Sequence, residues 1–436
     1  MVFKKKAIFL FLLIIILFGC GKKNVTTNQS TTAITTTTNS TTIEEYYEVS
    51  YFNWDNSFLG SEKVKEGDVP KGLGTDPIKK ANLGYYYDFL GWGPELNEVH
   101  SDKTYFALYS DLKLKEEMEN FDFESTDEIC VIKGIKNKDV TNIVVPDYVT
   151  SIDKGAFSGC SALESITLPF IGDKHHEPND LNQYPFGYIF GTDSYTGGTA
   201  TQQDYQGSSV STTSIKYYIP TTLREVIITG SSYIQSGSFY NCSNLTSITI
   251  PKSVTSIGKH AFSNCTCEII WGDNPSITTI GEYAFGGYKG ASITIPKSVT
   301  SIGSYVFSNC TCEIIWGDNP SITTIGSSAF RGYNVTSITI PKSVKRICEN
   351  AFFKCTNLTS ITIPKSVTTI DSEAFYGCSS LTNVYCYGTQ SDWENIEIDY
   401  GNTTLTNATI YYYSETEPSE TGNYWYYDEN GNIVIW

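Results

Sequence analysis

Residues 355–375 read CTNLTSITIPKSVTTIDSEAF, and variants of this stretch recur through most of the chain. Ile361 and Ile363 flank Thr362, and this period-two spacing predicts a short β-strand with both isoleucines inward and the threonine outward. Pro364 has no N–H to give to a neighbouring strand, so it ends the strand. We therefore expect one short strand per copy, with further apolar residues on the other walls of the same turn.

A phenylalanine near the end of each copy makes the repeat easy to follow. The eight such residues are Phe157, Phe239, Phe262, Phe285, Phe307, Phe330, Phe352 and Phe375. From Phe239 onward they are 22 or 23 residues apart. A constant period of this length predicts that each unit forms one coil stacked on the previous one. The predicted fold class is mainly β: a parallel-stacked solenoid over residues 127–383, preceded by a small β module.

The complete pattern of the copies is L-x-x-I-x-I-P-x-x-V-x-x-I-x-x-x-A-F-x-x-C. It resembles the BspA-type leucine-rich repeats of bacterial surface proteins over roughly residues 130–387. The resemblance implies a leucine-rich-repeat solenoid, attachment at the cell surface and binding of a partner. It names no ligand, because a fold does not specify one.

Two blocks of the solenoid, Ile250–Phe285 and Ile295–Phe330, are nearly identical and are offset by 45 residues. In each block one coil carries CEIIWGDNP in place of the usual strand, beginning at Cys267 and at Cys312. We expect a turn two residues longer than usual there, on one edge of the solenoid. The candidate ligand contacts in these turns are Trp271 and Trp316.

The stretch between Phe157 and Phe239 is longer than two coils require, which predicts an insertion over about residues 171–218. Long loops on rigid scaffolds are common recognition elements. The alternative is a passive decoration that packs over the sheet. The candidate ligand contacts in the insertion are Phe186, Tyr188 and Phe190.

Outward-facing threonines of the predicted strands form a row along the solenoid. Such a row could contact a ligand, or it could consist of hydrophilic β-formers on a solvated face. The members of the row that are candidate ligand contacts are Thr249, Thr294, Thr339 and Thr362.

The N-terminus has the pattern of an export signal. Lys4, Lys5 and Lys6 precede an apolar run that is shorter than the ~20 residues of a membrane-spanning helix. The run ends in Leu-Phe-Gly-Cys20, which resembles the lipobox of bacterial lipoproteins. The resemblance implies a signal peptide over residues 1–19 and a lipid on Cys20; the alternative is an ordinary secretory signal with an incidental cysteine.

Residues 20–44 are rich in threonine and have too few apolar residues to form a core, so we expect a flexible tether after the lipidated cysteine. The expected location is the extracellular face of the bacterial cell membrane, with the lipid on Cys20 as the contact with the membrane.

Residues 45–110 are predicted to form a small β module. A β-favouring run from Tyr47 to Phe52 precedes a turn-forming Asn-Trp-Asp-Asn stretch, which indicates a hairpin. The later order of V-x-E-G, F-x-G-W and T-Y-x-A resembles internalin B-repeat-like modules of the β-grasp type, and the resemblance implies a stalk or adhesion role. Trp92, in the F-x-G-W motif, is expected in the core of the module, with an exposed ligand platform as the alternative. Residues 111–126 are expected to be a linker.

The pattern lapses after residue 383. Residues 384–413 are expected to cap the last hydrophobic face of the solenoid. Residues 414–436 are expected to contain an acidic link and a terminal hairpin, because two apolar runs flank the polar Asp-Glu-Asn-Gly-Asn stretch.

The composition favours binding over catalysis. A formal net charge of −17 disfavours nucleic acid as a partner. The repeated cysteine, three residues after the phenylalanine, is interpreted as a small buried hydrophobe, although neighbouring pairs could form disulfides. No catalytic motif, cofactor or metal site is predicted, and the only dense ionisable cluster, His175-His176-Glu177, is expected in a solvated loop. We predict a non-catalytic surface recognition or adhesion protein that binds an extracellular protein or glycan; the alternative is a surface lipoprotein that captures or hydrolyses polysaccharide.

Overall fold

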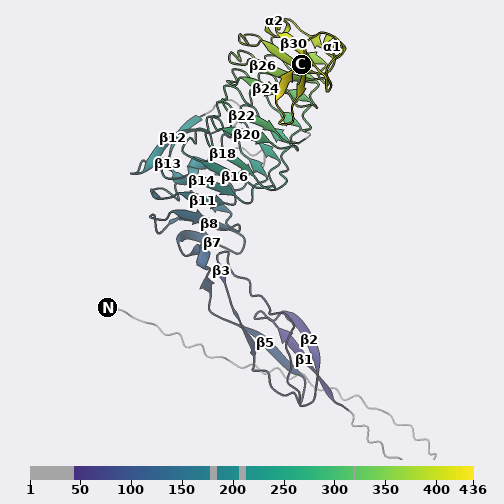
Figure 1. The fold of residues 1–436 in the computed structure, drawn as a ribbon. Helices are drawn as coiled ribbons and strands as arrows, with labels where there is room; N and C mark the ends of the chain where they lie inside the picture. The colour runs from purple at the N-terminus through teal and green to yellow at the C-terminus, as the bar shows by residue number, and fades with distance from the viewer. Residues whose placement is uncertain (1–43, 177–183, 206–212, 319) are drawn as a thin grey trace, which may run out of the picture.

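The computed structural model describes residues 44–176, 184–205, 213–318 and 320–436. A small β module lies at one end of an elongated solenoid (Figure 1). The predicted signal peptide, Cys20 and nearly all of the tether lie outside the described residues. Within the described ranges no helix has the length and apolar character needed to cross a membrane.

The N-terminal module is a four-stranded sheet in the order β2-β1-β5-β4. Its strands are β1 Tyr46–Phe52, β2 Phe58–Lys65, β4 Phe89–Gly93 and β5 Lys103–Tyr109. β1 and β2 are antiparallel, as the hairpin pattern predicts, whereas β1 and β5 are parallel. The ring of Trp92 lies 4.6 Å from that of the fully buried Tyr51, so this tryptophan packs against the core of the module.

Residues 111–126 are not a linker. They contain β6 Lys113–Leu114, the 3-10 helix η1 Glu116–Met118 and β7 Phe121–Ser125. β6 pairs with β3 Tyr85–Tyr86, and β7 pairs with β8 Cys130–Ile135. Met118 and Phe121 are buried in the core of the solenoid. A solenoid needs its first hydrophobic face covered, and these residues cover it.

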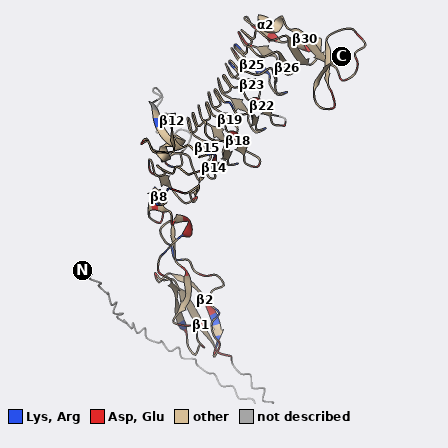
Figure 2. Ribbon diagram, turned by 60° about the vertical axis from the view of Figure 1, so that its left-hand side comes forward, with Lys and Arg blue, Asp and Glu red and all other residues tan. Residues whose placement is uncertain are grey.

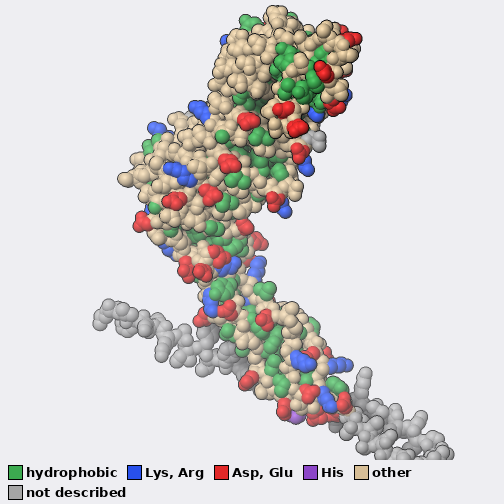
Figure 3. Space-filling view, in the orientation of Figure 1, with side chains coloured by type: hydrophobic (Ala, Val, Ile, Leu, Met, Phe, Trp, Pro, Cys, Tyr) green, Lys and Arg blue, Asp and Glu red, His purple; other side chains and the backbone are tan. Residues whose placement is uncertain are grey.

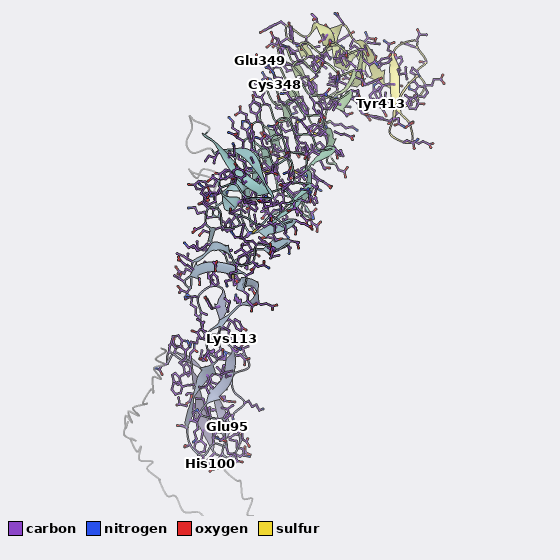
Figure 4. The ribbon with its side chains drawn as sticks, turned by 90° about the vertical axis from the view of Figure 1, so that its left-hand side faces the viewer. Glu95, His100, Lys113, Cys348, Glu349 and Tyr413 are labelled. Carbon is purple, nitrogen blue, oxygen red and sulfur yellow. The ribbon has the colours of Figure 1, made fainter. Side chains whose placement is uncertain are left out.

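The junction between the module and the solenoid is held by paired strands and by an ion pair. Lys113 of β6 bonds the carboxylate of Asp88. In Figure 4 Lys113 lies at this junction, whereas Glu95 and His100 lie toward the far tip of the module.

The main wall of the solenoid is built from parallel strands, one per coil, which confirms the predicted solenoid. The first group is β9 Asn142–Val144, β11 Ser165–Leu168, β14 Glu225–Ile228, β16 Ser247–Ile250 and β18 Glu268–Trp271. The second is β20 Ser292–Ile295 and β22 Glu313–Trp316. The third is β24 Ser337–Thr339, β26 Ser360–Pro364, β28 Asn383–Tyr387 and β30 Thr409–Tyr413. In strands such as β11, β14 and β16 alternate residues are buried, as the period-two pattern predicts, whereas in β26 and β28 the outward-facing Thr362 and Tyr385 are buried as well.

A second wall consists of two-residue strands. They are β10 Ser151–Ile152, β15 Tyr233–Ile234, β17 Ser256–Ile257, β19 Thr279–Ile280, β21 Ser301–Ile302, β23 Thr324–Ile325, β25 Arg346–Ile347, β27 Thr369–Ile370 and β29 Glu397–Ile398. From β15 to β21, and again from β23 to β29, the isoleucine of each strand pairs in register with that of the next, for example Ile257 with Ile280. The core therefore contains a column of isoleucines along this wall.

The eight phenylalanines are fully buried. From Phe239 to Phe375 their rings stack, with centroid separations of 5.0–5.8 Å between successive coils. The chain turns on either side of each ring through left-handed backbone positions, such as Gly287 and Asn309. Glycine and asparagine tolerate this conformation best, which explains why they recur two residues after the phenylalanine.

The coils continue past residue 383, so residues 384–413 extend the sheet with β28 and β30. Two short helices, α1 Gln390–Glu394 and α2 Thr403–Thr406, replace part of the usual coil here. The last coil is covered by the hairpin of β31 Tyr424–Tyr427 and β32 Ile433–Ile435, in which β31 pairs with β30 in parallel. Figure 2 shows this end of the chain projecting to one side of the last coils.

All eleven cysteines in the described residues are free thiols, and ten of them are buried. Several cysteines at the repeated position donate S–H to the carbonyl of a phenylalanine in a preceding coil, as Cys378 does to Phe352. The cysteine therefore acts as a small buried residue with one weak hydrogen-bond donor.

We expect these thiols to react slowly with iodoacetamide in the native chain at about pH 8, because burial lowers the thiolate fraction. Burial raises the pKa of Cys160 to about 11. Cys348, which is half-buried, is expected to react first, and the rest only after denaturation. Peptide-mapping mass spectrometry measures the rates. Rapid labelling of Cys160 before unfolding, or disulfide-linked peptides, would contradict this expectation.

Candidate functional site

The solvent side of the main sheet, here called the outer face, carries two rows of side chains set by strand register. The acidic row is Glu225, Glu268 and Glu313, each at the first residue of its strand. Two residues further along the strands runs the mixed row, in which threonine and aliphatic residues are interspersed. Its members are Val144, Thr167, Ile227, Thr249, Ile270, Thr294, Ile315 and Thr339. Figure 3 shows acidic side chains spaced along the solenoid with hydrophobic side chains near them.

The main sheet is interrupted twice. Hydrogen bonding between neighbouring strands stops after β18. It is present again between β20 and β22, and again from β24 onward. We call the gap between β18 and β20 the first opening and the gap between β22 and β24 the second opening. The phenylalanine column continues past both, because Phe285 and Phe307 stack at 5.8 Å and Phe330 and Phe352 at 5.0 Å. The coils therefore separate on the sheet wall only.

A tryptophan bridges each opening in place of main-chain hydrogen bonds. The indole Nε1 of Trp271 donates to the carbonyl oxygen of Thr294 at 2.7 Å. The indole of Trp316 makes the equivalent bond to Thr339 at 2.9 Å. Both indoles are half-buried, with part of the ring against the core.

A tyrosine occupies the other end of each opening. Tyr288 donates its hydroxyl to the carbonyl of Cys267, and Tyr333 donates to that of Cys312. Burial raises the pKa of both tyrosines, so each stays protonated and remains a donor. Where the repeat has cysteine at this position, adjacent strands pair normally. We attribute the openings to the larger tyrosine side chain, which holds consecutive strands apart.

The openings are associated with hollows in the surface. A hollow of about 480 Å³ lies at the second opening, lined in part by Glu313, Trp316, Tyr333 and Thr339. Another, of about 380 Å³, lies beside the first opening; Trp271, Asp273, Thr294 and Lys297 are among its lining residues. Each hollow therefore combines half an indole with hydroxyl and charged groups.

The acidic row of Glu225, Glu268 and Glu313 forms no ion pair with the described part of the chain. The guanidinium of Arg224 instead donates to the main-chain carbonyls of Thr221, Leu223 and Asn244. The acidic row is thus free to attract a cationic group.

The candidate contacts from the repeat pattern reach the surface at different places. Trp271 and Trp316 lie in the openings, and Thr294 and Thr339 are exposed on the outer face. Thr249 is half-buried in the same row. Sequence reasoning missed Ile270 and Ile315, which are 39% and 42% exposed on this face. The feature of the sequence that indicates these two residues is the E-I-I-W stretch, in which the second isoleucine stands at the outward-facing position of the strand.

Thr362 is not an open contact. Only 4% of its surface is exposed. Tyr427, in the terminal hairpin, lies near Thr362 and Thr339, whose hydroxyls act to lower its pKa against the effect of burial. The hairpin therefore closes the mixed row at this end of the outer face.

Phe186 and Phe190 are not ligand contacts either. They lie in the 3-10 helix η2 Phe186–Phe190 and are fully buried. Their rings fill the phenylalanine column between Phe157 and Phe239. Tyr188, on the same helix, is half-buried and its ring contacts Tyr184 at 4.3 Å. The insertion thus supplies core residues, and its β12 Gly198–Tyr205 and β13 Thr213–Pro220 form an antiparallel pair.

The histidine cluster is only partly described, because Glu177 lies outside the described residues. His175 packs its ring on Phe170 at 4.9 Å, and burial lowers its pKa. His176 contacts Asp173 at 2.6 Å. In the part of the chain that the structure describes, no three His, Cys, Asp or Glu side chains converge as metal ligands.

A comparison with known protein families finds a match along the solenoid. The profile of the BspA type leucine-rich repeat region matches in six copies, over residues 134–174, 213–317 and 313–411. No curated protein matches.

Solved structures with similarity include a leucine-rich repeat protein from Bacteroides ovatus, at 21% identity over 70% of this chain and 71% of that one, with a TM-score of 0.37. A leucine rich cell surface protein from Faecalibacterium prausnitzii shares 21% identity over 64% of this chain and 96% of that one, with a TM-score of 0.25. A leucine rich repeat protein of T. pallidum shares 18% identity over 60% and 88%, with a TM-score of 0.22. The repeat profile covers more than half of the sequence, and the chain belongs to the BspA-type leucine-rich repeat family.

Proposed function

We propose that this chain is a bacterial surface recognition or adhesion protein that binds an extracellular protein or glycan through the outer face of its main sheet. In this proposal the lipid on Cys20 anchors the chain at the extracellular face of the membrane, and the solenoid holds the binding face away from it. The chain's membership of a repeat family supports a scaffold role.

The observation that carries the proposal is the outer face between β14 and β24. Ile270 and Ile315 are exposed there, where other coils place threonine. Each of these isoleucines lies next to the half-buried tryptophan of its own strand, at an opening. Exposed aliphatic groups beside hollows with polar rims are typical of interaction sites.

The proposal is tested by blocking this face. We expect the full chain, screened on arrays of extracellular proteins and glycans, to bind at least one ligand. A double variant, Thr294→Arg with Thr339→Arg, should weaken that binding by about tenfold or more, because bulky charged side chains within a contact patch obstruct docking.

A matched control places the same substitutions on the second wall. Thr300 and Thr323 are exposed and precede β21 and β23, so Thr300→Arg with Thr323→Arg changes the net charge equally. Equal loss of binding in the two double variants would overturn the outer face as the contact surface. So would unchanged binding by the Thr294 and Thr339 variant.

A further inference from the structure

The acidic row of Glu225, Glu268 and Glu313 recurs on every second coil, which restricts the ligand that could fit it. The rings of the phenylalanine column step by 5.2–5.8 Å in this region. Measured along the phenylalanine column, coils two apart are thus about 11 Å from each other, close to the ~10.8 Å of two turns of an α-helix. On the sheet wall the first opening lies between Glu268 and Glu313, so the step between these two glutamates is longer than the step from Glu225 to Glu268.

The mixed row beside these carboxylates supplies the apolar part of the surface. Ile227, Ile270 and Ile315 follow the three glutamates by two residues on the same strands, and therefore point to the same side of the sheet. Each glutamate is accompanied by one aliphatic side chain. The face repeats an acidic group and an aliphatic group once every two coils.

We propose, on the basis of the proposed function, that the outer face binds a basic amphipathic α-helix of a partner protein, lying along the solenoid axis. Lysine or arginine residues seven positions apart on one face of that helix would each meet one glutamate. Leucine or similar residues next to them would contact the isoleucines and the edges of the two openings. The charge complementarity favours a polypeptide with cationic groups over a neutral glycan.

The docked helix would end before the terminal hairpin. Tyr427 of the hairpin lies near Thr362, which is only 4% exposed. From Glu225 to Glu313 there are four coil steps, about 22 Å along the phenylalanine column, which corresponds to about 15 residues of helix. This length sets the size of the probe.

The test uses a labelled synthetic peptide of about 18 residues, rich in alanine, with three lysines at seven-residue spacing and leucines beside them. Fluorescence anisotropy with the full chain measures its affinity. We expect saturable binding that weakens as salt rises, because exposed charge pairs are screened. A peptide of the same composition with lysines five residues apart should bind at least ~5-fold more weakly, since its charges no longer lie on one helix face.

The chain itself offers a matched pair of variants. Changing Glu225, Glu268 and Glu313 to glutamine should weaken binding of the seven-spaced peptide by about tenfold. The control changes Glu349, Glu373 and Glu397 to glutamine, which removes the same net charge elsewhere. Figure 4 places Glu349, with Cys348, on the side of the solenoid opposite Tyr413 of the main sheet.

Equal affinity of the two triple variants would mean attraction by net charge alone and would overturn the proposal, as would no binding to the unmodified chain. A failure of the helix proposal can be distinguished from a failure of the proposed function. If arrays identify a neutral glycan whose binding depends on Thr294 and Thr339, the outer face is a recognition site and the helix proposal is wrong.

Discussion

Replacing Phe330 with alanine is expected to remove about 3–5 kcal/mol from the free energy of unfolding. Phe330 is fully buried, and its ring stacks between those of Phe307 and Phe352, at 5.2 Å and 5.0 Å. It also contacts Tyr333 and Trp316, the two side chains that frame the second opening. The cavity left by alanine would lie in the phenylalanine column beside the second opening, where β22 and β24 are not paired and the column holds the two coils together.

Denaturant unfolding followed by circular dichroism measures this loss. In a stacked-repeat protein each coil contacts only its neighbours, so we expect the transition to broaden or divide as the two halves uncouple. Tyr376→Ala is the control, because Tyr376 also stacks on an aromatic ring but is 50% exposed. A loss below about 1 kcal/mol for Phe330→Ala would contradict the role assigned to the column.

Replacing Trp425 with alanine is expected to release the terminal hairpin. Trp425 is 0% exposed, lies 5.1 Å from the ring of Tyr413 and 5.6 Å from that of Tyr385, and donates its indole N–H to the carbonyl of Cys386 at 3.0 Å. Truncating a buried tryptophan costs about 3–5 kcal/mol. The cost should fall on the hairpin itself, because the hairpin pairs with the solenoid only through β31 and β30.

Limited proteolysis and size-exclusion chromatography measure the release. We expect cleavage between residues 414 and 423, and self-association, because undocking exposes the edge of β30 and a cluster of tyrosines. Trp436→Ala is the matched control, since this tryptophan is 42% exposed, stacks on the hairpin residue Tyr426 and bonds the carbonyl of Ser414 through its indole N–H. If the Trp425 variant resisted cleavage as well as the control did, the hairpin would not depend on this side chain.

The sequence predicted the columns of the solenoid because every coil repeats the same inward positions. Ile361 and Phe375 could be placed from spacing alone, and both are buried. The same reasoning failed where the period is broken. Phe186 and Phe190 complete the phenylalanine column, but they come from an insertion whose length hides their place in the repeat.

The openings were missed for a different reason. Tyr288 and Tyr333 were visible in the sequence as substitutes for cysteine, yet the period gives no measure of how a larger side chain separates two strands. Thr362 lies near Tyr427, far along the chain, and no local pattern encodes that proximity. Local periodicity predicted the coils, whereas contacts between distant segments determine which part of the outer face stays open.

The duplicated blocks suggest how this molecule could change its length over evolutionary time. Unequal recombination between the two blocks would delete or add one pair of coils without shifting any column out of alignment, because both blocks begin and end at the same point of the coil. The terminal modules would be unaffected. Each such event would remove or add one tryptophan opening and one glutamate of the acidic row. The length of the solenoid and the number of these groups would therefore change together, by one pair of coils at a time.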